Sequence, residues 1–248
     1  MIPIRDHNPT RTTSYLTISL IVANVLIFLT EPISATNVTQ ARFFFCKAAI
    51  PFEVLHGHQL TEIAQHYSCA GKNVWWSIVY SMFLHGGFLH IAGNMLFLWI
   101  FGNNIEDRLG RLKFLVLYFA AGFAATFAQS LVAGGLSNVP TQSSIQPMVG
   151  ASGAIAGVLG AYILLFPRAR VDTLIIFFFI TVVEVPAYVM IGVWFLLQVF
   201  SGVASVGATA SSGVAFFAHI GGFIAGMILL GILRPRRAPP PEWPPSYA

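Results

Sequence analysis

A serine near the middle of this chain lies among small residues, in the stretch Gly150-Ala151-Ser152-Gly153. The stretch opens an apolar segment, 152–166, that stops before Pro167, and this pattern predicts a helix that begins at the serine. A serine at a helix start either caps the helix or acts as a nucleophile beside free backbone N–H groups that can hold an oxyanion. Capping is the commoner role, and the motif by itself leaves both interpretations open.

Other polar side chains interrupt the apolar segments, and these are the second group of candidates. They are His85, His90 and Asn94 in one segment, and His219 in the stretch Ala218-His219-Ile220-Gly221-Gly222 of the last. Polar groups within a bilayer are costly and are functional candidates by default. At a rise of about 1.5 Å per residue, Ser152, His90, Asn94 and His219 reach one level in one leaflet. Four groups from three helices at one depth favour a catalytic site over hydrogen bonds that merely join helices.

The sequence offers no set of ligands for a metal. It has no H-E-x-x-H motif, and Asp6, Asp107 and Asp172 fall outside the predicted spans. Glu184 is the only acid near the interior of a span, where it is interpreted as a loop end. We therefore expect no metal, no cofactor and no paired-aspartate chemistry.

Composition decides the class of protein that must position these residues. The chain has 248 residues, of which 56% are hydrophobic and only 9% are charged, against about a quarter charged in soluble domains. It is therefore predicted to be an all-α, polytopic membrane protein. Its net charge of +4 is not a nucleic-acid signal, and the partner it implies is the lipid bilayer.

Six apolar runs are long enough to count as predicted spans. The run 171–185 is also apolar, but Glu184 and Pro186 interrupt it, so it is interpreted as a loop or partly embedded hairpin. The six predicted spans are 14–30, 83–103, 114–132, 152–166, 186–202 and 214–233.

Basic residues orient these spans. Ten of the thirteen Lys and Arg residues lie on the side that carries both termini, and only Arg42, Lys47 and Lys72 lie on the other. The excess of positive charge marks the cytoplasmic side, so both termini are predicted to be cytoplasmic. The domain organisation is then a cytoplasmic segment 1–13, a six-helix domain 14–233 with a long outer loop 31–80, and a Pro-rich cytoplasmic tail 234–248 that is expected to be extended and disordered.

The outer loop holds both cysteines, Cys46 and Cys69. They can pair if the loop faces an oxidising compartment, and two free thiols are equally compatible with the sequence.

The spans also show small-residue faces, Gly153 with Gly157 in the fourth and Ala218 with Gly222 and Gly226 in the sixth. Such faces allow close helix contact, which would bring a short serine side chain to an imidazole.

Together these motifs resemble the rhomboid family of intramembrane serine proteases over about residues 75–230. The shared stretches, in family order, are His85-Gly86-Gly87-Phe88-Leu89-His90 with Asn94, Gly102 through Glu106-Asp107-Arg108-Leu109-Gly110, Gly150-Ala151-Ser152-Gly153, and Ala218-His219-Ile220-Gly221-Gly222 with Gly226. The resemblance implies a six-transmembrane-helix bundle in the cell membrane that cleaves transmembrane protein substrates near the outer leaflet. It also implies an active site that opens to the outer side.

The resemblance assigns roles to individual residues. It implies that Ser152 is the nucleophile and His219 the general base of a dyad, and that Asn94, His90 and the backbone N–H of Ser152 stabilise the oxyanion. Chemically, His219 would take the serine proton and return it to the leaving amine, while the helix start favours developing negative charge.

Two positions depart from the pattern of some family members. Trp76-Ser77 stands where a Trp-Arg pair is found in those members, and Ala156 stands where an aromatic side chain supports the histidine, so another ring must support His219.

Two further functions compete with proteolysis: a catalytically inactive relative that binds membrane proteins, and a transporter or channel. A catalytically inactive relative usually lacks one of Ser152 and His219, and a transporter needs polar groups at several depths, whereas the inner halves of these spans have almost none.

Overall fold

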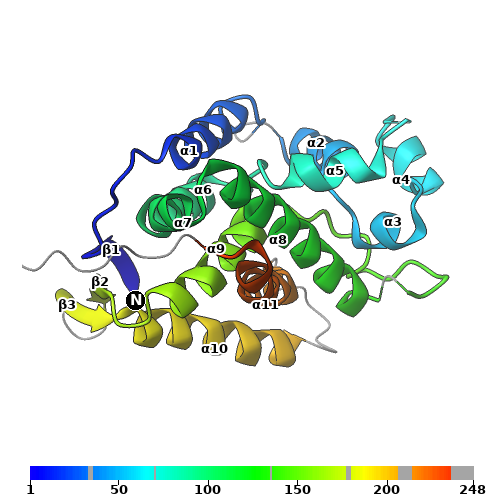
Figure 1. Cartoon of the computed structure of the whole chain (residues 1–248). Helices are drawn as coiled ribbons and strands as arrows, with labels where there is room; N and C mark the ends of the chain where they lie inside the picture. The colour runs from blue at the N-terminus through cyan, green and yellow to red at the C-terminus, as the bar shows by residue number, and fades with distance from the viewer. Residues whose placement is uncertain (33–35, 70, 135, 177–179, 206–213, 236–248) are drawn as a thin grey trace, which may run out of the picture.

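The computed structural model describes residues 1–32, 36–69, 71–134, 136–176, 180–205 and 214–235. The described residues form a helical bundle with a cluster of short helices on one flank and a small β-sheet on the other (Figure 1). The predicted Pro-rich tail from 236 onwards and residues 206–213, in the uncharged stretch between the fifth and sixth predicted spans, lie outside this description.

Helices lie at all six predicted positions. They are α1 (Tyr15–Phe28), α6 (Phe88–Phe97) continued by the π-helical turn η1 (Leu98–Gly102) and α7 (Asn103–Leu109), α8 (Arg111–Val132), α9 (Ser152–Leu165), α10 (Ala187–Ser205) and α11 (Phe216–Leu233). Among the described residues, four of these helices are long and apolar enough to cross a membrane: Phe88–Leu109, α8, α10 and α11. The α1 and α9 helices are apolar but have 14 residues each. The chain is thus a multi-pass membrane protein, and the count of six spans stays a prediction.

The second helix is shifted along the chain relative to the predicted span 83–103. It begins at Phe88, so His85 precedes it, and it continues through η1 and α7 to Leu109. Asp107, placed outside the spans from sequence, therefore lies in the last turn of this helix. Its neighbour Glu106 is buried and accepts hydrogen bonds from the backbone N–H groups of Leu16 and Thr17, at 3.0 and 2.7 Å. Those groups belong to the first turn of α1, so Glu106 caps that helix and fixes it to the second.

A three-stranded antiparallel sheet is the main departure from an all-α fold. The hairpin predicted at 171–185 is present as β2 (Arg170–Ile176) and β3 (Ile180–Pro186), and β1 (Ile2–Asp6) pairs with β2. Glu184 is therefore a strand residue, not a loop end. The sheet lies between the second helix and α10, since β1 contacts α6 and η1 while β2 and β3 contact α10 (Figure 1).

Burial raises the pKa of Asp6, the last residue of β1, even though hydrogen bonds to its carboxylate oppose the shift. Those bonds come from the Tyr162 hydroxyl at 2.7 Å and the Asn104 amide at 2.8 Å. They tie the N-terminal strand to both α9 and α7. The sequence did not predict this arrangement, because the residue pattern of 2–6 does not indicate which distant strand β1 pairs with.

The outer loop 31–80 contains four short helices: α2 (Asn37–Lys47), α3 (Pro51–His56), α4 (Thr61–His66) and α5 (Val74–Ser81). A disulfide joins Cys46 to Cys69, which settles the pairing that the sequence left open. Lys72 and Glu53 form a buried ion pair at 2.7 Å beside it. Trp75 and Trp76 remain exposed on α5, as suits an interfacial helix.

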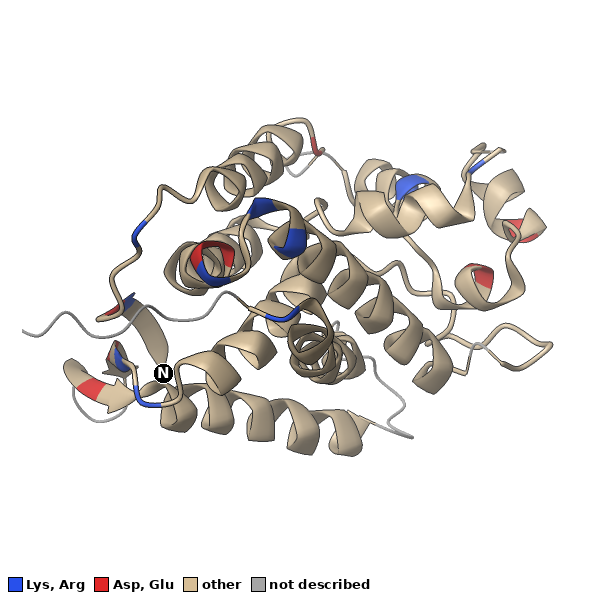
Figure 2. Cartoon of the chain, in the orientation of Figure 1, with Lys and Arg blue, Asp and Glu red and all other residues tan. Residues whose placement is uncertain are grey.

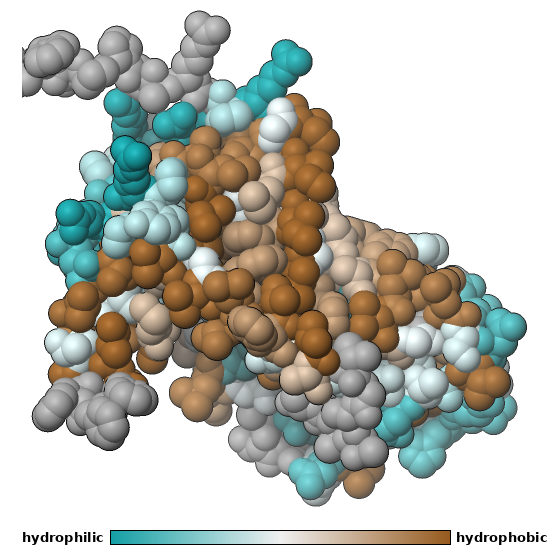
Figure 3. All heavy atoms as spheres, turned by 90° about the horizontal axis from the view of Figure 1, so that it is seen from below, coloured by the Kyte–Doolittle hydropathy of each residue, from teal (hydrophilic) through white to brown (hydrophobic). Residues whose placement is uncertain are grey.

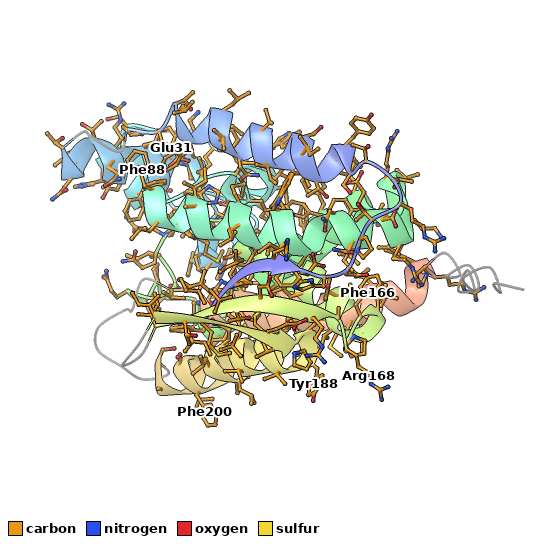
Figure 4. All side chains as sticks on the ribbon, turned by 90° about the vertical axis from the view of Figure 1, so that its left-hand side faces the viewer. Glu31, Phe88, Phe166, Arg168, Tyr188 and Phe200 are labelled. Atoms are coloured by element: carbon orange, nitrogen blue, oxygen red, sulfur yellow. A yellow bond between two sulfur atoms is a disulfide. The ribbon has the colours of Figure 1, made fainter. Side chains whose placement is uncertain are left out.

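The bundle helices that carry the candidate site bear no charge. No Lys, Arg, Asp or Glu occurs in α9, α10 or α11 (Figure 2). The face formed by α10 is broadly apolar (Figure 3), with Tyr188, Leu196, Leu197, Phe200 and Val203 more than half exposed. Tyr188 and Phe200 project outward from it (Figure 4). Such a surface fits lipid rather than water.

Candidate active site

Helices α9 and α11 pack so closely that their glycine backbones touch. A Cβ added at Gly222 would collide with the carbonyl oxygen of Gly153, and one added at Gly226 would collide with that of Gly157. The contacts advance along both helices in the same direction, so the two helices run parallel. The small-residue faces predicted for the fourth and sixth spans therefore meet each other.

This packing places Ser152 against His219. Ser152 is the first residue of α9 and His219 lies in the first turn of α11, so parallel helices put both at the same end. The Ser152 Oγ is 2.8 Å from the His219 Nε2. The N-cap of α9 is Ala151, not Ser152. Hence the serine hydroxyl contacts an imidazole and does not cap its own helix.

The other ring nitrogen of His219 meets a residue of α10. The Nδ1 atom is 2.8 Å from the Gln198 Oε1. The Trp194 ring lies one turn earlier on α10, with its centroid 5.8 Å from that of His219 and its plane tilted by 39°. Trp194 and Gln198 thus contact His219, where some family members have an aromatic side chain at the position of Ala156. Ala156 itself is fully buried within α9.

His90 presents its Nε2 to the same space. The backbone N–H of Gly86 donates to the His90 Nδ1 at 3.3 Å, so the ring hydrogen of the neutral imidazole is on Nε2. A Cβ added at Gly150 would lie 2.8 Å from this Nε2 and 3.5 Å from the Ser152 Oγ. Only glycine fits there, both for space and because its φ is +123°. The His90 donor is therefore beside Ser152.

Asn94 lines the same cavity as Ser152, His90 and His219, a cavity of about 780 Å³. Its side chain is 7% exposed. Among the described residues its Nδ2 is buried without a hydrogen-bond partner. A buried amide donor left unpaired is costly, and it is available to an acceptor that arrives with a ligand.

His85 lies behind the cavity. Its ring packs edge-on against His90, with centroids 5.1 Å apart at 70°, and its side chain is fully buried. The backbone N–H of His85 donates to Glu31 Oε1 at 2.9 Å. His85 thus packs against His90 but does not itself line the cavity. Glu31 is at the far end of α1, near Phe88 (Figure 4).

Glu31 makes the stability of this region depend on pH. Burial raises the pKa of Glu31 from 4.5 to about 7, although the hydrogen bond from His85 opposes the shift. The folded state then favours the protonated carboxyl, and a penalty develops as pH rises through about 7. We expect Glu31→Gln, which keeps the acceptor oxygen, to stabilise the protein at pH 8.5 by about 1–2 kcal/mol after allowance for solvent screening. Thermal unfolding at pH 8.5 and pH 4.5 measures this, and an equal effect at both would contradict it.

Within the part of the chain that the structure describes, no three His, Cys, Asp or Glu residues are grouped to hold a metal ion. The polar side chains that line the cavity include the Ser152 hydroxyl, the imidazoles of His90 and His219, and the amides of Asn94 and Gln129. That set suits nucleophilic attack and hydrogen bonding to an anion.

Comparison with known proteins identifies the family of this chain. Residues 72–236 match the Rhomboid domain. The chain belongs to the rhomboid family. It is 34% identical over 154 residues to Rhomboid protein 1, mitochondrial, of Saccharomyces cerevisiae, which covers 61% of this chain and 40% of that protein.

Two further relatives show the spread of this rhomboid protein's similarities. Rhomboid protease GluP of Bacillus subtilis is 36% identical over 98 residues, covering 40% of this chain and 17% of GluP. Presenilin-associated rhomboid-like protein A, mitochondrial, of Danio rerio is 32% identical over 99 residues, covering 40% and 24%. The chain thus matches less than half the length of these relatives.

The sequence analysis did not identify Gln198 and Trp194 as residues that contact His219. Both lie within the predicted fifth span, where Gln198 is a polar residue in a run of apolar ones. The rule that singled out the histidines and Asn94 applies equally to a glutamine within a predicted span, so a signal for Gln198 was present. For Trp194 there was none, because an aromatic in a membrane helix is ordinary.

Proposed function

We propose that this rhomboid protein is an intramembrane serine endopeptidase that cleaves transmembrane segments of other membrane proteins near the outer leaflet. The single observation that carries the proposal is the 2.8 Å contact between the Ser152 Oγ and the His219 Nε2 at the floor of the cavity. A hydroxyl this close to an imidazole nitrogen is the arrangement that activates serine as a nucleophile.

The proposed reaction is described by its proton transfers between Ser152, His219, the leaving amine and water. His219 Nε2 takes the Ser152 proton as Oγ attacks the scissile carbonyl, and the imidazolium returns it to the leaving amine as the acyl-enzyme forms. Water then attacks the ester, giving one proton to His219, which passes it back to Ser152 as the acid is released. The carbonyl oxygen becomes an anion in each tetrahedral intermediate.

Three donors are available to that anion. They are the backbone N–H of Ser152 in the first turn of α9, the Nε2–H of His90, and the Nδ2 of Asn94, which has no hydrogen-bond partner in the described part of the chain. The positive end of the α9 dipole adds to their effect. Donors fixed before the reaction cost no reorganisation when charge develops, which is why such groups lower the barrier.

Orientation in the membrane is part of this proposal. A disulfide between Cys46 and Cys69 fits an oxidising compartment on the side of the outer loop. The basic residues gather on the opposite side, where both termini lie. The active site then opens to the outer side, with both termini in the cytoplasm.

A serine-directed fluorophosphonate tests the function. We expect wild type to be labelled at Ser152, and Ser152→Ala to remain unlabelled while still folded. An inactive relative or a transporter would give no labelling above the Ser152→Ala background, and that result would contradict the proposal.

We expect membrane substrates to enter laterally between α6 and α10. The cavity reaches this boundary, since Leu89 and Phe97 line it from α6 and Trp194 and Ser205 from α10. The uncharged stretch 201–213 was expected from the sequence to be a loop that acts as a lid. Residues 201–205 are instead the last turn of α10, and residues 206–213 lie outside the described part, so the lid stays a prediction. A bismaleimide bridge between Leu89→Cys and Val203→Cys, both strongly exposed, should block cleavage of a transmembrane substrate.

The controls for the bridge are each single-cysteine variant treated alike and a short soluble peptide substrate. The native cysteines form a disulfide and do not react with the reagent. We expect the bridged enzyme to keep cleaving the soluble peptide, because water still reaches Ser152. Unimpaired cleavage of the transmembrane substrate after complete bridging would count against lateral access here.

A further inference from the structure

The Nδ1 atom of His219 has a partner that the dyad does not require. It lies 2.8 Å from the Gln198 Oε1, and a carboxamide oxygen can only accept a hydrogen bond. This contact therefore holds the imidazole hydrogen on Nδ1. Its Nε2 is left with a free lone pair, facing the Ser152 hydroxyl at 2.8 Å. That tautomer is the one in which His219 can take the serine proton.

We propose that Gln198 is a positioning residue that fixes the tautomer and ring orientation of His219, so that three helices supply the reactive unit. The inference rests on the proposed protease function and goes beyond the dyad. Trp194 assists by packing beside the ring, four residues before Gln198 and hence on the same face of α10. Neither side chain touches the substrate carbonyl in this role.

A neutral amide suits this position better than an acid does. No charged residue occurs in α9, α10 or α11, and an unpaired carboxylate within the bilayer is costly. The amide oxygen accepts the Nδ1–H without bringing a charge that needs its own partner. It therefore does the orienting part of what a buried aspartate does in soluble serine proteases.

The hydrogen bond between Gln198 and His219 also links helix α10 to the dyad of Ser152 and His219. Ser152 and His219 lie on α9 and α11, whose backbones are in contact, whereas α10 has only four buried residues and a largely exposed outer face. Displacement of α10 separates Gln198 from His219 without moving the dyad. The general base is thus fully oriented only when α10 is seated against α11, which links substrate access to turnover.

Three variants test the role. Gln198→Leu has a similar size but no acceptor, and we expect kcat to fall about 10- to 100-fold, part of the contribution of a general base, with KM changed less than about threefold. Gln198→Glu keeps the acceptor oxygen. Leu197→Ala, on the exposed side of the same helix, is the matched control and should behave as wild type.

The pH profile distinguishes positioning from packing. A carboxylate beside the imidazole favours its protonated form, so in Gln198→Glu the acidic limb of kcat/KM should move to higher pH. Activity on the alkaline side should recover well above that of Gln198→Leu. A purely structural glutamine would leave Gln198→Glu no more active on the alkaline side than Gln198→Leu, and that outcome would overturn the proposal.

Rates are expressed per site labelled to completion by fluorophosphonate, so that misfolded enzyme is not counted. If Gln198→Leu loses labelled sites but keeps its kcat per site, the residue only stabilises the fold and the proposal is wrong. Ser152→Ala separates this result from failure of the function itself. Cleavage by Ser152→Ala would refute the protease, whereas an inactive Ser152→Ala with a normal Gln198→Leu refutes the positioning role alone.

Discussion

Replacing Ser152 by alanine is expected to reduce cleavage of a transmembrane substrate to below about 1% of wild type, and His219→Ala is expected to do the same. The serine supplies the atom that bonds to the substrate, and the histidine supplies the base 2.8 Å away. Removing one member of such a unit costs nearly as much as removing both. The double variant should therefore be no slower than either single one.

Purified variants in proteoliposomes with a fluorogenic transmembrane substrate provide the measurement. Both variants should unfold near the wild-type temperature, because each removes few contacts. Ser130→Ala is a matched control, since that serine is also buried in a bundle helix and, within the described part of the chain, its hydroxyl bonds only to the Thr126 carbonyl. Residual cleavage above about 1% in either dyad variant would refute the assigned chemistry.

Asn94→Ala should lower kcat by about 10²–10³ while changing KM little. The Asn94 Nδ2 is buried and unpaired among the described residues, so it gains its hydrogen bond only when a substrate oxygen arrives. A donor that bonds more strongly to the oxyanion than to the ground-state carbonyl affects kcat. His90 and the Ser152 N–H remain, so the loss should be partial, unlike that in the dyad variants.

The competing role for Asn94 is to hold the second helix in place. In that case Asn94→Ala would lower the unfolding temperature and leave kcat per labelled site almost unchanged. Asn24→Ala shows what such a change looks like, because Asn24 is fully buried in α1 and its amide donates to Leu20 O at 2.7 Å. Measuring both quantities on each preparation decides between the roles, and an unchanged kcat would remove Asn94 from the site.

Local sequence patterns were sufficient to predict the membrane helices and the candidate catalytic residues. Apolar runs specify membrane helices because every backbone polar group must be satisfied within the bilayer. A polar residue inside such a run is conspicuous for the same reason, so Ser152, His90, Asn94 and His219 could be named without coordinates. The glycine spacing also predicted close contact of two helices, which the structure contains at Gly153 and Gly222.

Contacts between distant segments were decided only by the tertiary structure. Strand β1 pairs with β2 across more than half the chain, and no local pattern names such a partner. Whether Ser152 capped its helix or faced an imidazole depended on where α11 packs. The link from His219 to Gln198 depended on the rotation of α10 about its own axis, because its apolar residues are spread round the helix and favour no single face. The sequence thus determined which residues could react, and packing determined which of them meet.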